Sequence, residues 1–164
     1  MQGLPRHQDR QRGDRHFHDH DQFDGQHRGP LDGAGVRPWS WEGNVQDRII
    51  EHLKNEGWTI ERAANTATRE TGKDIVAKRE ERRLWVSVKG YPEKSMNFQA
   101  RHWFGGAVFD LLVYRSADPI VELGIGLPGG FKTYTNLLPK VTWAKAQLPF
   151  FVFWVAQSGA VTVE

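Results

Sequence analysis

The sequence has no cysteine among its 164 residues. Disulfide bonds, thiolate zinc sites and thiol nucleophiles are therefore excluded. No apolar run approaches the roughly 20 residues of a membrane-spanning helix, and the first residues lack the apolar core of a signal peptide. These absences predict a soluble, cytoplasmic protein. The formal net charge of +2 is too small to indicate a nucleic-acid partner by itself, so a basic surface has to come from local clustering.

Residues 1–38 differ in composition from the rest of the chain. They hold five of the seven histidines and no lysine, their six arginines are balanced by six aspartates, and their few apolar residues show no period. Such a segment buries too little apolar surface to offset its ordering entropy, which predicts a disordered tail over 1–38 and one domain over 39–164. The stretch "HFHDHD", residues 16–21, either chelates a soft divalent metal or is simply solvated.

The spacing of apolar residues within 39–164 predicts an α/β fold. A helix is expected over 40–57, with Ser40 as N-cap and Gly57 as its stop. The remaining expected elements are strands over 58–64, 73–79 and 83–90, a helix over 97–115, a strand over 119–128, a helix over 132–147 broken at Pro139, and a hairpin over 150–164. This order predicts a sandwich with a mixed central sheet flanked by helices, an α-β-β-β-α-β core followed by a C-terminal helix and hairpin.

Two charged residues are expected to meet at one end of this sheet. Successive strand residues alternate faces, so Ser87 and Lys89 share one face of their strand. If the strands over 73–79 and 83–90 pair as a hairpin, Asp74 and Lys89 converge. A carboxylate there can hold Mg²⁺, and the ammonium can orient an attacking water and stabilise charge on a phosphate. A purely structural salt bridge accounts for the same two residues.

Two helical residues are further candidates for the site. Glu42 lies three and seven residues before Val45 and Ile49, so it points toward the sheet, where a charge needs a partner or a metal. Alternatively, it only complements the helix dipole. Gln99 lies one turn before Trp103 on the same helix face. Its amide either positions the lysine or contacts a nucleic-acid backbone, or it is a polar residue at a helix start.

Glu42, Asp74 in "GKDIVA", Lys89 in "VSVKGYP" and Gln99 in "QARHW" together resemble the PD-(D/E)XK nuclease superfamily, in its restriction-endonuclease-like and Holliday-junction-resolvase-like forms. The resemblance spans residues 41–127 and implies a Mg²⁺-dependent DNA endonuclease, with Mn²⁺ as a substitute metal, acting in restriction, defence or repair. It implies that Asp74 and the main-chain carbonyl of Val88 ligate the metal, joined by Glu42 directly or through water. Lys89 would handle the nucleophilic water, and Gln99 would support the site.

The sequence departs from the superfamily at Ser87, where glutamate or aspartate is usual. A neutral hydroxyl removes one negative charge and should weaken Mg²⁺ binding. Three alternatives stay open: Glu42 supplies the missing acid, the serine and a bound water suffice, or the domain binds DNA without cutting it. A fourth hypothesis is an assembly domain in which Asp74 and Lys89 form only a salt bridge.

Four basic residues, Arg62, Arg69, Lys94 and Arg101, are predicted to contact DNA phosphates, although an ordinary solvated surface accounts for them equally. A homodimer is also possible, because many members of the superfamily pair to cut two strands. The apolar stretch "FFVFWVA", residues 150–156, either supplies that interface or is a buried strand.

Overall fold

The computed structural model describes residues 37–66 and 72–164. The predictions made for residues 1–36, including "HFHDHD", and for Arg69 lie outside these ranges. Two residues assigned to the tail, Arg37 and Pro38, are within them. The Pro38 carbonyl accepts hydrogen bonds from the Trp41 N–H (2.9 Å) and the Asn44 side chain (2.8 Å), so the described fold begins slightly before Trp39.

The element order confirms the predicted fold class. The elements are α1 (Glu42–Asn55), β1 (Thr59–Ala63), β2 (Ile75–Arg79), β3 (Arg82–Val88), α2 (Met96–Ala117), β4 (Glu122–Pro128), α3 (Lys132–Leu137), a 3₁₀ turn (Leu138–Val141), α4 (Thr142–Gln147), β5 (Phe151–Val155) and β6 (Val161–Val163). The predicted break at Pro139 falls in the 3₁₀ turn between α3 and α4. Across the described ranges, none of these helices combines the length and apolar character needed to cross a membrane.

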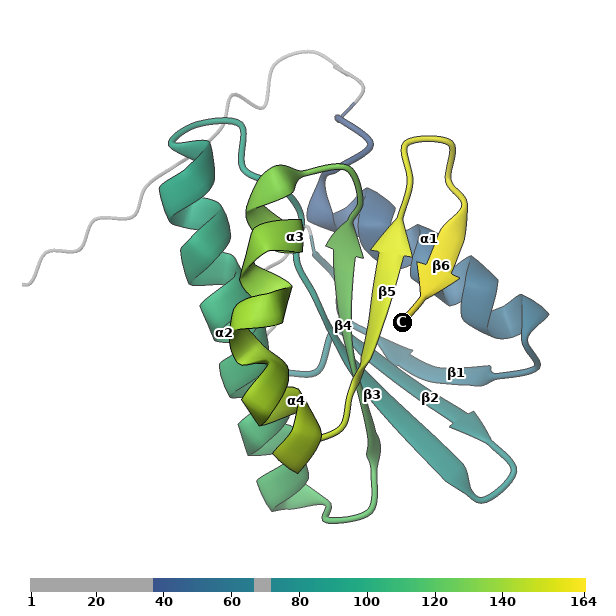
Figure 1. Cartoon of the computed structure of the whole chain (residues 1–164). Coiled ribbons are helices and arrows are strands. Elements are labelled where there is room, and N and C mark those ends of the chain that lie inside the picture. Colours follow the sequence, from purple (N-terminus) through teal and green to yellow (C-terminus); the bar gives the residue numbers. More distant parts are fainter. Residues whose placement is uncertain (1–36, 67–71) are drawn as a thin grey trace, which may run out of the picture. The chain divides into compact units, whose positions relative to one another are not determined.

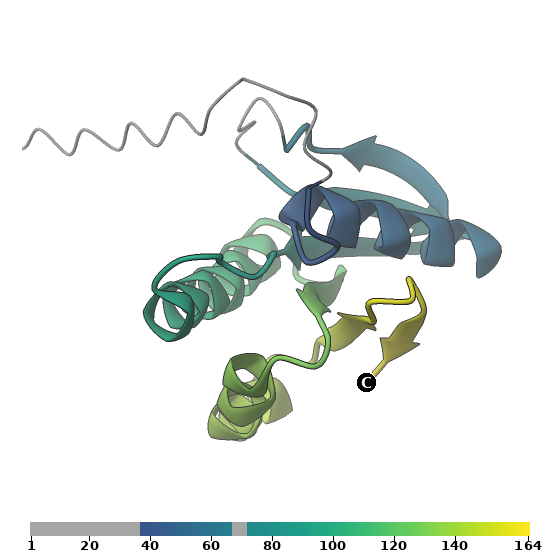
Figure 2. The same cartoon turned by 90° about the horizontal axis from the view of Figure 1, so that it is seen from above.

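The six strands form one mixed sheet in the order β1-β2-β3-β4-β5-β6 (Figure 1). β1, β2 and β3 pair antiparallel, β3, β4 and β5 pair parallel, and β6 returns antiparallel to β5. Viewed from above, α1 lies on one side of the sheet and α2, α3 and α4 lie on the other (Figure 2).

The faces of β3 follow the predicted alternation. Val86 and Val88 pack in the apolar cluster that includes Ile49 of α1. Trp85 packs on the other side, in the cluster that includes Leu111 of α2. Ser87 therefore shares the face of the sheet that α2 covers.

The stretch "FFVFWVA" is a buried strand of the sheet. β5 is hydrogen-bonded to β4 on one side and to β6 on the other, and its Val152, Phe153 and Val155 are buried. Phe151 keeps 39% of its surface exposed, which is the apolar area that this stretch offers to a dimer interface.

The start of α1 corrects one prediction. The helix begins at Glu42, and no side chain caps it, so Ser40 is not the N-cap. Ser40 is instead buried, and its carbonyl accepts a hydrogen bond from the Tyr91 N–H (2.8 Å). This contact joins the entry to α1 to the segment after β3. The predicted stop is confirmed, because Gly57 adopts a φ of 82° just after α1 ends.

The close approach between these two segments requires glycine at position 90. A Cβ on Gly90 would lie 2.6 Å from the Glu42 nitrogen and 2.8 Å from the Ser40 oxygen. Both are backbone atoms, which cannot rotate aside as a flexible side chain can. The fold therefore depends on the missing side chain at this position.

We expect Gly90→Ala to lower the free energy of unfolding by about 1–3 kcal/mol, because overpacking forces the two segments apart. Urea unfolding measures this loss. Gly129→Ala is the matched control, since its new Cβ would meet nothing closer than the Val155 oxygen at 3.4 Å, and its stability should change by less than about 0.5 kcal/mol. Equal stability of both variants would contradict the inferred role of Gly90.

Candidate active site

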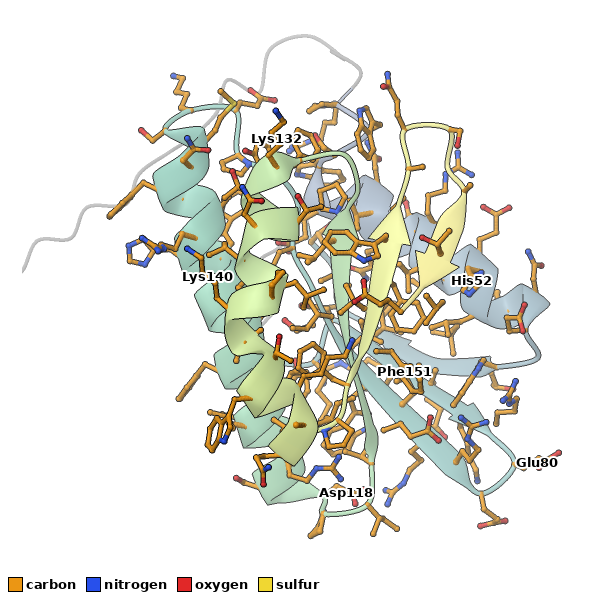
Figure 3. All side chains as sticks on the ribbon, viewed as in Figure 1. His52, Glu80, Asp118, Lys132, Lys140 and Phe151 are labelled. Atoms are coloured by element: carbon orange, nitrogen blue, oxygen red, sulfur yellow. The ribbon has the colours of Figure 1, made fainter. Side chains whose placement is uncertain are left out.

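The candidate site lies at the end of the sheet where β2 begins and β3 ends. β2 and β3 are antiparallel neighbours, so Asp74, just before β2, lies near Lys89, just after β3. The Lys89 Nζ is 3.7 Å from the Asp74 Oδ2. Figure 3 marks the two ends of the sheet, with Glu80 in the β2–β3 turn at the far end and Lys132, at the start of α3, at the end that carries the site. The expected convergence of Asp74 and Lys89 is therefore present.

A third acid, Asp110, reaches this site from α2. Its Oδ2 lies 3.4 Å from the Lys89 Nζ and accepts a hydrogen bond of 2.7 Å from the Ser87 hydroxyl. Ser87 is fully buried, with 0% of its surface exposed, so its hydroxyl has a fixed direction. The serine therefore holds an acid that the helix supplies on the same face of the sheet.

Two further groups hold Asp74 in place, one through its side chain and one through its main chain. The Val88 N–H donates a hydrogen bond of 2.6 Å to the Asp74 Oδ2. Gln46, buried one turn after Glu42 on α1, donates its amide to the carbonyls of Ala64 (2.9 Å) and Asp74 (3.4 Å). Gln46 thus anchors the approach to β2 from the opposite face of the sheet. Sequence reasoning missed it, although its spacing from Glu42 places both on one helix face.

Glu42 lies in the same electrostatic environment. Burial raises the pKa of the Glu42 carboxyl, and the nearby Lys89 ammonium offsets this only in part. Burial also raises the pKa of Asp74, against the opposing effects of Lys89 and the Val88 N–H. Asp110 adds its own charge to both environments. The three carboxylates therefore outnumber the one ammonium by two, and Lys89 compensates the burial of Glu42 and Asp74 only in part.

A hollow of about 220 Å³ adjoins Glu42. It is bordered by Thr66, Gly90 and three aromatic side chains, Trp41, Tyr91 and Trp103. Tyr91 is fixed by stacking on Phe131, with ring centroids 3.7 Å apart. Glu42, at one side of the acidic cluster, therefore shares this hollow with three aromatic side chains.

Gln99 is not brought into this cluster. No hydrogen bond joins its side chain to another residue within the ranges 37–66 and 72–164. It precedes Asp110 by three turns of α2, or about 16 Å along the axis, and Asp110 is the α2 residue that contacts Ser87 and Lys89.

Three of the basic residues predicted to contact DNA, Arg62, Lys94 and Arg101, lie on different segments of the described chain. The Arg62 guanidinium lies near Gly72, two residues before Asp74. Lys94 is exposed between β3 and α2. Arg101 borders a separate hollow with Lys132. Of these three, Arg62 lies on the segment that leads to Asp74.

The chemistry of the donor set fits a hard divalent cation, although no three histidine or carboxylate side chains are grouped at metal-binding spacing in the described part of the chain. The carboxylates are instead arranged around Lys89. The Asp74 and Asp110 contacts with Lys89, Val88 and Ser87 all run to the Oδ2 atoms, not to Oδ1. Carboxylate oxygens with excess negative charge are the ligands that Mg²⁺ prefers.

This α/β sandwich is similar in fold to solved structures of other proteins. Its fold is similar to that of an fdxN element excision controlling factor protein from Anabaena variabilis, at a TM-score of 0.50 and 17% identity over 72% of this chain and 95% of that chain. An XisH family protein from Nostoc punctiforme is also similar, at a TM-score of 0.46 and 18% identity over 72% of this chain and 95% of that one. No protein-family model and no curated protein sequence matches the chain.

The raised pKa of Glu42 predicts that ionising this side chain destabilises the fold when no metal is bound. The folded protein holds the proton above the ordinary value of 4.5, so stability falls as the pH rises from that value through the raised pKa. We therefore expect Glu42→Gln to unfold at higher urea than the wild type at neutral pH in chelator. The difference should disappear at a pH well below 4.5.

Glu51→Gln is the matched control for this prediction. Glu51 is also on α1, but its side chain is 62% exposed. Its substitution should give no such gain at neutral pH. A Glu42→Gln variant less stable than the wild type at neutral pH would mean that the interaction with Lys89 outweighs burial.

Proposed function

We propose that this chain is a metal-dependent DNA endonuclease that hydrolyses phosphodiester bonds at the Glu42, Asp74, Asp110 and Lys89 cluster. The observation that carries the proposal is the position of Lys89, with its Nζ 3.7 Å from Asp74 and 3.4 Å from Asp110. A lone structural salt bridge needs only one acid, whereas here two acids lie within 4 Å of one ammonium and its charge also acts on Glu42. This excess of acid supports a site that takes up a cation.

The metal would be held by Asp74 and Asp110, with Glu42 joining directly or through a water. Mg²⁺ is the expected ion and Mn²⁺ its substitute, because all the donors are hard oxygens. A bound ion would supply Lewis-acid stabilisation of the phosphate and lower the pKa of a water. The Val88 carbonyl stays a proposed ligand, supported by the tendency of a strand residue to direct its N–H and C=O to the same edge.

Lys89 and Ser87 have distinct proposed roles. The Lys89 distances to both acids exceed those of a normal N–H···O hydrogen bond. Its ammonium protons are thus able to bind an attacking water or a phosphate oxygen, which orients the nucleophile and stabilises developing charge. Ser87 positions Asp110, one of the proposed metal ligands, since its hydroxyl donates to that carboxylate. The acid missing from β3 is, in this proposal, the acid present on α2.

DNA as the substrate is supported by the surroundings of the cluster. Arg62 precedes the site on the β1 segment, and aromatic rings of Trp41 and Trp103 border the hollow beside Glu42. Basic groups bind phosphates, and the ring of Trp103, which is 37% exposed, can stack on a base. The Anabaena variabilis protein of similar fold is named for control of fdxN element excision. A role in DNA excision, restriction or repair is therefore part of the proposal.

The first test is metal-dependent nicking of supercoiled plasmid by the full chain, with Mg²⁺, Mn²⁺ or chelator. We expect Lys89→Ala and Asp110→Asn each to lower the nicking rate by about 100-fold or more, because each removes a charge from the reacting centre. Lys140→Ala, an exposed site on the 3₁₀ turn, should keep full activity. Salt-sensitive DNA binding without nicking by the wild type would indicate a binding module on the same fold.

Metal binding is measured separately, by the rise in thermal midpoint that Mg²⁺ produces. The wild type should show this rise and Asp74→Asn should not. Stabilisation by Mg²⁺ without DNA cleavage or binding would separate a metal site from a nuclease. If Mg²⁺ neither stabilises the chain nor supports cleavage, the metal-dependent mechanism is wrong.

An exchange of positions tests whether Asp110 replaces the acid expected at position 87. Ser87→Glu alone should be inactive and less stable, because it buries a second carboxylate against Asp110 where a hydroxyl now donates. The double variant Ser87→Glu with Asp110→Ser returns the acid to β3 and a hydroxyl to α2. We expect it to recover at least about a tenth of the wild-type nicking rate, on the scale of a single catalytic group. Nicking by Asp110→Ser alone at the wild-type rate would show that Asp110 is dispensable.

A further inference from the structure

The outward face of α2 carries an apolar stripe. Its members recur at alternating intervals of four and three residues, which keeps them on one side of a helix. They are Phe98, His102, Gly105, Phe109, Leu112 and Ser116, with Val113 beside them. The buried residues of the helix occupy the opposite side and face the sheet: Ala100, Phe104, Ala107, Leu111 and Tyr114.

This stripe is unusually exposed for its composition. Phe98 is 68% exposed, Phe109 63%, Leu112 51% and Val113 49%. At roughly 200 Å² for a whole phenylalanine, the two rings alone expose on the order of 250 Å². Together with the two aliphatic side chains, the patch approaches the few hundred Å² above which an exposed apolar surface usually marks an interaction site. The stripe contains no Lys, Arg, Asp or Glu.

Two adjacent glycines interrupt this exposed face. A Cβ built on Gly105 or on Gly106 meets nothing within 4 Å, so no close contact within the described chain requires either glycine. Each destabilises an exposed helix by about 1 kcal/mol relative to alanine. Their effect is a notch in the stripe, one turn before the exposed ring of Phe109. The missing side chain at Gly105 and the large ring of Phe109 are therefore complementary in shape.

We propose that α2 pairs antiparallel with α2 of a second copy of this chain, about a two-fold axis near residue 107. The intervals of the stripe read the same in both directions about that point. Antiparallel pairing there sets Phe109 of each copy opposite Gly105 of the other. It also sets Leu112 opposite His102, and Phe98 opposite Ser116.

A second copy fits this face for three physical reasons. A two-fold interface must be self-complementary. In this pairing the Phe109 ring of each copy lies in the Gly105 notch of the other, so the same contact forms twice. No like charges within the stripe oppose each other, because the stripe has none. The exposed apolar area is also comparable in scale with the roughly 800 Å² that each partner contributes to a standard interface, once the polar rim is added. None of these reasons depends on the proposed nuclease activity.

Sedimentation velocity of the full chain at micromolar concentrations tests the pairing. We expect a reversible dimer whose dissociation constant rises by about 30-fold or more in Phe109→Glu. Trp143→Glu is the control, since Trp143 is 78% exposed on α4 rather than on α2, and its dimer should be unchanged. A wild-type monomer overturns the proposal, and so would a monomer in which residues 1–36 cover the stripe. A dimer that Phe109→Glu leaves intact overturns it as well.

Gly105→Leu separates loss of pairing from loss of folding. Leucine is a better helix former than glycine and has open space here, so the unfolding midpoint of the dilute monomer should rise. The same side chain fills the notch, so the dissociation constant of the dimer should increase. A Gly105→Leu chain that is stabilised and pairs as well as the wild type contradicts the ring-in-notch arrangement.

The absence of cysteine allows the direction of pairing to be read by cross-linking. In the double variant His102→Cys with Leu112→Cys, each new thiol lies opposite its partner in the second copy. The two positions are about 15 Å apart within one helix, too far for a disulfide inside the chain. We expect a covalent dimer from the double variant and little from either single variant. Efficient cross-linking of His102→Cys alone would show a parallel arrangement instead.

Discussion

The ammonium of Lys89 is the constraint on which the candidate site depends. It is the cation between Asp74 and Asp110, and its charge also acts on Glu42. Three carboxylates gathered at a partly buried sheet end repel one another and lose hydration. Lys89 offsets this only in part, because burial still raises the pKa of Glu42 and of Asp74. The fold therefore gathers three carboxyl groups around one ammonium, which is more acid than a single salt bridge contains.

Local rules were enough to predict most of the fold and three of the four residues of the cluster. Asp74 and Lys89 lie in adjacent strands joined by a short turn, so alternation of faces and hairpin pairing determine where both side chains lie. The same alternation placed Ser87 beside Lys89. Glu42 followed from helical spacing. Each inference needs only neighbouring sequence and one pairing, which is why these positions could be read before the structure.

Long-range packing determined the rest. Asp110 is four, seven and eleven residues after Gly106, Trp103 and Gln99, so the spacing argument that selected Glu42 was available for it. Attention to Gln99 placed the functional group at the start of α2, whereas the level at which a helix crosses the sheet decides which turn meets Lys89. No local sequence pattern specifies the height on the sheet at which α2 crosses it. Ser40 failed as an N-cap for a similar reason, since its backbone is bound to the segment after β3.

The departure at position 87 has a physical explanation once Asp110 is included. A serine on β3 and an aspartate on α2, joined by a hydrogen bond of 2.7 Å, keep a carboxylate beside Lys89. The position of this carboxylate then depends on where α2 packs against the sheet, rather than on β3, a strand that is paired along both of its edges. Leu111 and Tyr114 hold that helix against the sheet, while the adjacent Phe109 faces outward. Phe109, a residue of the proposed pairing surface, and Asp110, the proposed catalytic acid, are thus consecutive residues of one rigid helix. Contacts on the outer face of α2 therefore bear directly on the position of Asp110.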